Sequence, residues 1–145
     1  MFGFRKTIDI ITLFHKSGSP ASMRVVTLLK QASATAAESA TEDQASDHRG
    51  QTETAAGARR ETFDLNITED PPTTEQLQTI LEYVGLPGIP GIVKGASSTH
   101  EALKKFRENN DSFQRPVVVD WNNGKAIAGD KESEILKLLG MSKGH

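Results

Sequence analysis

The chain has 145 residues, enough for one domain of ordinary size. Its 36% hydrophobic and 25% charged residues are typical of a globular protein, and a net charge of −2 lacks the basic excess of nucleic-acid-binding proteins. No apolar run is long enough to span a membrane. The absence of cysteine excludes disulfides, cysteine-ligated metals and thiol nucleophiles.

The first ordered elements are predicted to be a strand, a helix and a second strand. Residues 7–14 are β-branched and apolar, which indicates a buried strand. Residues 22–32 carry a wide apolar face and are predicted to form a helix, with Ser19 or Ser22 as its cap and Pro20 in its first turn. Residues 61–68 alternate apolar and polar side chains, as a strand with one buried face does.

Between these two strands lies a segment of unusual composition, residues 33–61. It contains no valine, isoleucine, leucine, methionine, phenylalanine, tyrosine or tryptophan. Such a segment buries too little apolar surface to offset the entropy lost on ordering. We therefore expect a disordered insertion within a single domain of residues 1–145.

Two further helices are predicted in the middle of the chain. Thr73 precedes Gln76 by three residues, which is the spacing of a capping box, and a helical apolar pattern follows. Residues 85–96 are rich in glycine and proline, so we expect the helix to end there in an irregular loop. Ser98 is the predicted cap of a short second helix, residues 99–109.

The chain ends in a predicted hairpin and helix. Residues 115–121 and 125–129 form the two strands, because the Asn-Gly pair between them favours a tight turn. Asp130 is expected to cap a last helix, residues 131–139. The whole order predicts an α/β fold with a mixed four-stranded sheet and helices on both faces.

Two stretches in this order resemble the thioredoxin fold, most closely its arsenate-reductase-like and Spx-like members. "TLFHKSGSPASMRVVTLLKQ" resembles the strand, loop and first helix, and "RPVVVDWNNGKAIAGDKESEILKLL" resembles the ending. The second stretch, with "ITLFHK" and "PPTTEQLQTILEYVG", is also similar to a fungal family of mitochondrial redox proteins whose redox role is assigned by fold. The resemblance implies a mitochondrial localisation, with the cytoplasm as the alternative.

The resemblance also implies a set of candidate ligand-binding residues, and no catalytic residue. The two-cysteine motif of thiol enzymes would fall between Ser19 and Ser22, and the family's proposed single cysteine would fall within residues 22–25. The Arg115–Pro116 bond is expected to be cis, with the backbone before Pro116 facing a peptide or glutathione. Gly129 and Asp130 resemble the position where glutaredoxin-like proteins hold the γ-glutamyl group.

Each of these residues also has a structural explanation. Ser19, Ser22 and Asp130 are good helix caps, and Arg115 suits a solvated turn. Asp120 and Trp121 are expected to close the hairpin turn and to pack. The four histidines have no metal-ligand spacing, and we expect a surface role for His15.

Two functions are compatible with this sequence. One is an oxidoreductase of the resembled redox type, which without cysteine would need an external thiol or a cofactor. No flavin or nicotinamide motif is present, so no cofactor is expected other than glutathione. The other is a non-catalytic module that binds a peptide, glutathione or another protein, with no role in nucleic-acid binding.

Overall fold

The computed structural model describes residues 9–45 and 62–141, with side chains described over 9–37 and 62–141. Its elements are, in chain order, β1 (Asp9–Phe14), α1 (Pro20–Ala45), β2 (Phe63–Thr68), α2 (Thr74–Ile92), α3 (Thr99–Glu108), the short 3₁₀ helix η3 (Asn110–Ser112), β3 (Val117–Asp120), β4 (Lys125–Ala128) and α4 (Glu132–Leu138). The four strands form one sheet in the order β2-β1-β3-β4. β1 and β2 are parallel, whereas β3 is antiparallel to both β1 and β4. The predicted α/β class and mixed sheet are confirmed.

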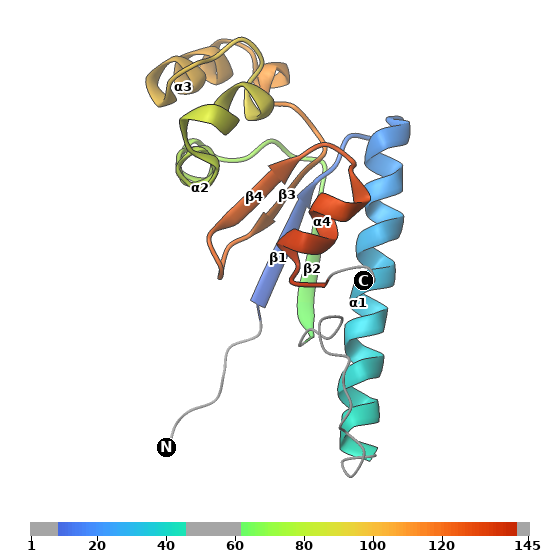
Figure 1. Cartoon of the computed structure of the whole chain (residues 1–145). Coiled ribbons are helices and arrows are strands. Elements are labelled where there is room, and N and C mark those ends of the chain that lie inside the picture. The colour runs from blue at the N-terminus through green and yellow to red at the C-terminus, as the bar shows by residue number, and fades with distance from the viewer. Residues whose placement is uncertain (1–8, 46–61, 142–145) are drawn as a thin grey trace.

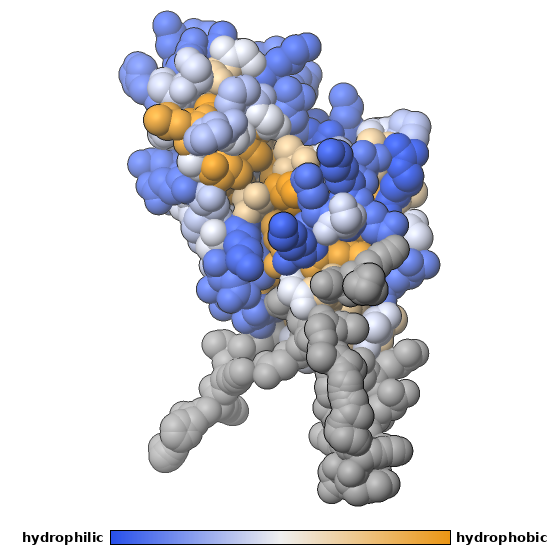
Figure 2. All heavy atoms as spheres, in the orientation of Figure 1, coloured by the Kyte–Doolittle hydropathy of each residue, from blue (hydrophilic) through white to orange (hydrophobic). Residues whose placement is uncertain are grey.

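Helices cover both faces of the sheet, with α1 and α4 on one side and α2 and α3 on the other (Figure 1). Alternation along β1 separates the two cores, because successive side chains of a strand point to opposite faces. Ile11 and Leu13 join the cluster beneath α1 and α4, which also holds Val118 of β3. Phe14 joins the cluster beneath α2 and α3. Apolar surface is visible over α2, where Leu86 is 67% exposed (Figure 2).

Helix α1 is longer than the sequence analysis predicted. It does not end near Ala32 but continues to Ala45, past the end of the sheet (Figure 1). The predicted start of the disordered insertion at Ser33 is therefore wrong, and residues 46–61 of that segment lie outside the described residues. Alanine is the strongest helix former and its small side chain lets the helix approach the sheet closely. Ala36 is fully buried in the same cluster as Phe63 of β2.

Helix α2 begins where it was predicted but does not stop at Gly85. The capping box is formed, since Gln76 N–H donates to Thr73 Oγ1 and Thr73 N–H donates to Gln76 Oε1, both at 3.0 Å. Gly85 has φ 72° and ψ 174°, which breaks the helical path. The chain then turns helical again up to Ile92, so the irregular loop expected from residue 85 is corrected to a kinked helix. Pro87 is tolerated because it lies in the first turn after the kink, where N–H groups have no helical partner.

The remaining elements follow the predicted order. Ser98 caps α3, its Oγ accepting from Glu101 N–H at 3.1 Å. The hairpin joins β3 to β4 with Asp120 opposite Lys125, and Gly124 takes a positive φ of 66° in its turn. Helix α4 begins at Glu132 and packs Ile135 and Leu138 into the core. Its N-cap position is Lys131, which makes no side-chain capping bond, so the prediction that Asp130 caps this helix is wrong.

Candidate functional site

The residues predicted for a ligand site lie at elements that meet at one end of the sheet. Ser19 and Ser22 begin α1 directly after β1, whereas Pro116 immediately precedes β3 and Gly129 follows β4. β1 and β3 are antiparallel, so the end of one meets the start of the other, and Phe14 lies opposite Val117. Gly129 N–H donates to the Pro116 carbonyl at 3.0 Å, which ties the end of β4 to the same place.

The two serines at the start of α1 have different roles. Ser19 is the cap: its Oγ accepts from Ser22 N–H at 3.2 Å, and its carbonyl accepts from Met23 N–H. Ser22 lies inside the first turn and is fully buried. Its Oγ accepts from Lys16 N–H at 3.0 Å, which closes the loop between β1 and α1. Ser22 therefore holds this loop from within, and its hydroxyl does not reach the protein surface.

His15 is the residue that the sequence analysis misjudged most clearly. It is not a surface residue but 8% exposed, and its Nδ1 lies 2.5 Å from Ser22 Oγ. Its backbone N–H donates to the Thr68 carbonyl at 2.8 Å, which extends the pairing of β1 with β2 by one residue. The signal in the sequence was alternation, because Ile11, Leu13 and His15 share one face when the strand is continued.

The Arg115–Pro116 peptide bond is cis, and Pro116 is buried. The β1–β3 register ends with Phe14 opposite Val117, the residues that adjoin His15 and Pro116. Pro116 therefore lies at the same end of the sheet as His15, next to the β1–β3 pairing of Phe14 with Val117. Arg115 is bound rather than solvated: its side chain is 16% exposed, and Nη1 donates to the Glu69 carbonyl at 3.0 Å.

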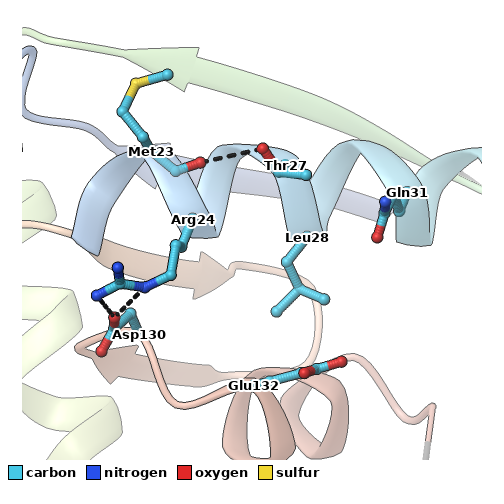
Figure 3. Close-up of a pocket in the computed structure, with 7 residues that line it drawn as sticks. All are labelled: Met23, Arg24, Thr27, Leu28, Gln31, Asp130 and Glu132. Atoms are coloured by element: carbon cyan, nitrogen blue, oxygen red, sulfur yellow. Dashed lines mark hydrogen bonds and ion pairs between the residues drawn. The ribbon is translucent and has the colours of Figure 1, made fainter. Parts of the chain in front are cut away.

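Asp130 pairs with a residue that the sequence analysis did not single out. Arg24 donates to one Asp130 oxygen, Oδ2, from Nε at 2.9 Å and from Nη2 at 2.6 Å. This ion pair stands at a groove of about 470 Å³ between α1 and the start of α4 (Figure 3). The groove is lined by Met23, Arg24, Thr27, Leu28, Gln31, Asp130 and Glu132. Two charges 106 residues apart carry no local signal, which is why Arg24 was missed.

The predicted structural roles of Asp120 and Trp121 match the contacts that the structure shows. Asp120 is fully buried, and its carboxylate accepts from the backbone N–H and the Nδ2 group of Asn123 at 3.2 and 2.9 Å. Trp121 Nε1–H donates to Thr12 Oγ1 at 2.9 Å, and its ring packs edge-on against Tyr83. Both residues stabilise the turn end of the sheet, opposite to the end that carries His15.

Neither a metal site nor a membrane-spanning helix is found in the part of the chain that the structure describes. Among the described side chains, those of residues 9–37 and 62–141, no group of three histidine, aspartate or glutamate residues is arranged to hold a metal ion. No helix of these residues is long and apolar enough to cross a bilayer.

Comparison with known proteins identifies the family. The chain belongs to the family described as "Protein of unknown function (DUF1687)", whose model matches residues 2–130. It is similar to a protein of Schizosaccharomyces pombe named "Putative redox protein fmp46, mitochondrial", with 38% identity over 63 residues, which cover 43% of this chain. The match covers 52% of the relative, about half its length. No solved structure matches significantly.

These similarities confirm the predicted resemblance to a fungal family of mitochondrial redox proteins. They support a redox role at the level of the family and a mitochondrial localisation by family resemblance. This member of the family contains no cysteine.

Proposed function

We propose that this chain is a thioredoxin-like protein that binds glutathione or an extended peptide and does not itself perform thiol–disulfide exchange. The strand order β2-β1-β3-β4, with one parallel and two antiparallel pairings, supports a thioredoxin-like topology. The relative's name supports a redox role at the level of the family.

One observation carries the proposal. The chain has no cysteine, and the serine at the start of α1 has its hydroxyl fully buried between His15 and the Lys16 N–H group. Thiol–disulfide exchange needs a thiolate that can reach a disulfide sulfur. Ser22 supplies neither the thiolate nor the access. The groups that remain at this end of the sheet are suited to binding: the backbone before Pro116, the first turn of α1 and the His15 ring.

The structure also changes which residues the ligand would touch. Ser22 was a candidate for direct contact, but its burial makes it a supporting residue. Asp130 is already paired with Arg24, so a γ-glutamyl ammonium group would compete with this guanidinium for the carboxylate. The remaining candidates are therefore Ser19, the backbone at Arg115 and the His15 ring.

The test is a titration of ¹⁵N-labelled protein with glutathione, followed by amide chemical shifts. At about 10 mM ligand, a site with a millimolar Kd is largely occupied. We expect shifts confined to the residues around His15, Ser19, Arg115 and Gly129. Shifts scattered over α3 or the absence of any shift would reject glutathione as the ligand of this site.

The oxidoreductase alternative is separated by a second assay. Reduction of insulin disulfides by glutathione, which is oxidised to its disulfide in the process, is followed with and without the protein. We expect equal rates, because the chain has no thiol to relay electrons. A rate above the protein-free control would favour the oxidoreductase, in which glutathione bound at the site would supply the thiol.

A further inference from the structure

The His15 ring is held at one nitrogen and open at the other. Nδ1 is bonded to Ser22 Oγ, and no described residue bonds to Nε2. Over residues 9–37 and 62–141, the buried side-chain polar atom left without a partner is Ser112 Oγ. Because Nε2 is not such a buried atom, it touches solvent, although the His15 residue as a whole is only 8% exposed. The imidazole therefore presents one nitrogen from an otherwise buried ring.

The hydrogen-bond inventory at Ser22 decides which nitrogen carries the proton. A hydroxyl has one proton and two lone pairs, and the Lys16 N–H already occupies one lone pair. If Nδ1–H donated to Ser22 Oγ, the hydroxyl proton would be left without an acceptor in a fully buried residue, which is costly. If the hydroxyl donates to Nδ1, every polar atom of the pair is satisfied and the imidazole proton lies on Nε2.

We propose that Ser22 is a positioning residue that holds His15 as the neutral tautomer protonated on Nε2, and that this N–H group is the donor which the site offers to its ligand. The ligand atom that it recognises is an acceptor, and for glutathione this is the thiolate sulfur. The inference rests on the proposed function, since it names the group that would bind the thiol. Ser22 occupies a position where thiol enzymes carry a cysteine. In this proposal its hydroxyl bonds to His15 and does not contact the ligand.

The tautomer is measured first, in the wild-type protein without ligand. Long-range ¹H–¹⁵N correlations in weakly alkaline buffer distinguish protonation at Nε2, at Nδ1 and at both nitrogens. We expect Nε2 alone to be protonated in His15. A proton on Nδ1, or a ring protonated at both nitrogens, would overturn the inference without affecting glutathione-induced amide shifts elsewhere in the site.

The ligand contact is measured next, with glutathione and S-methylglutathione as paired probes. Glutathione should shift the His15 Nε2–H signal, whereas the thioether, which has no thiolate, should shift the amides near Gly129 and leave Nε2–H almost unchanged. Equal effects of both probes on Nε2–H would reject the thiolate contact. If neither probe shifts any amide, the proposed function fails, and the proposed contact between Nε2–H and the thiolate fails with it. The tautomer measured without ligand still tests whether Ser22 positions the His15 ring.

Two variants separate positioning from simple destabilisation. Ser22→Ala removes the hydroxyl that donates to His15 Nδ1, so both neutral tautomers of His15 should become populated. Glutathione binding should weaken about tenfold, which is the effect of one well-formed hydrogen bond. Ser19→Ala removes the neighbouring cap, which does not touch His15, and should leave the tautomer unchanged. If the folded Ser22→Ala variant still showed His15 protonated on Nε2 alone, the inference would be contradicted. If this variant does not fold, the wild-type measurement decides.

Discussion

Arg24 on α1 and Asp130 after β4 form an ion pair in which two guanidinium N–H groups, at 2.9 and 2.6 Å, share one carboxylate oxygen. The pair links the first helix to the connection that leads into the last one, and it borders the groove of Figure 3. It stands where the resemblance places a γ-glutamyl contact, so it also determines how available the carboxylate is to a ligand.

We expect the Arg24–Asp130 pair to contribute little to stability. The side chains are 66% and 30% exposed, and solvent-exposed pairs typically couple by about 0.2–1 kcal/mol. A double-mutant cycle with Arg24→Ala and Asp130→Ala, measured by urea denaturation, should give a coupling in this range that decreases with added salt. Lys131 and Glu134, at 3.9 Å and more exposed, provide a control pair with weaker coupling. A coupling above about 2 kcal/mol, or one insensitive to salt, would contradict the assignment.

The burial of Ala36 predicts that α1 cannot accept a larger side chain there. Ala36→Leu should lower the free energy of unfolding by about 1–3 kcal/mol, because the methyl group already fills its space against β2. Ala34 is exposed on the same helix, so Ala34→Leu should change stability by less than about 0.5 kcal/mol. Equal effects of the two substitutions would mean that α1 does not pack against the sheet beyond Ser33.

The burial of Ser22 predicts the reactivity of an engineered thiol. The native chain has no cysteine, so Ser22→Cys and Met23→Cys each carry a single thiol. Ser22 is fully buried and Met23 is 49% exposed. The Met23→Cys thiol should react with an aromatic disulfide reagent at least about tenfold faster, because a buried thiol reacts through local opening. In concentrated urea the two rates should converge, and a faster reaction at residue 22 in the folded protein would contradict its burial.

Glu101 is expected to make stability depend on pH in the acidic range. The Ser97 backbone N–H and then the Ser97 hydroxyl donate to its carboxylate, and they lower its pKa from the ordinary value of 4.5. The contribution of ionised Glu101 to the free energy of unfolding is therefore present above pH 4.5. It is lost as the pH falls through the lower pKa of the folded state. A ¹³C titration of the carboxyl group should show a midpoint below 4.5 in the native protein.

A substitution at Ser97 tests the order of these causes. Ser97→Ala removes the hydroxyl but keeps the backbone N–H, so the Glu101 pKa should rise only part of the way towards its ordinary value. Complete restoration in Ser97→Ala would show that the hydroxyl, not the backbone group, holds the pKa down.

Features that depend on neighbours within a few residues were predictable from the sequence. The Thr73–Gln76 capping box forms because each side chain reaches a backbone group three residues away. A β-branched apolar run located β1, alternation of apolar residues located β2, and the Asn-Gly pair located the hairpin. Zero cysteine likewise settled, without any structure, which chemistry this family member lacks.

Contacts between distant segments were decided by the tertiary structure alone. Composition argued for disorder from Ser33, yet Ala36 is buried because β2 brings Phe63 against that turn of α1. Asp130 looked like a helix cap, and folding gave it Arg24 as a partner from 106 residues away. His15 was predicted to be a surface residue, but the loop between β1 and α1 brings Ser22 Oγ within hydrogen-bond distance of its ring. Local pattern specifies which elements form, whereas the pairing of polar groups depends on which elements the sheet brings together.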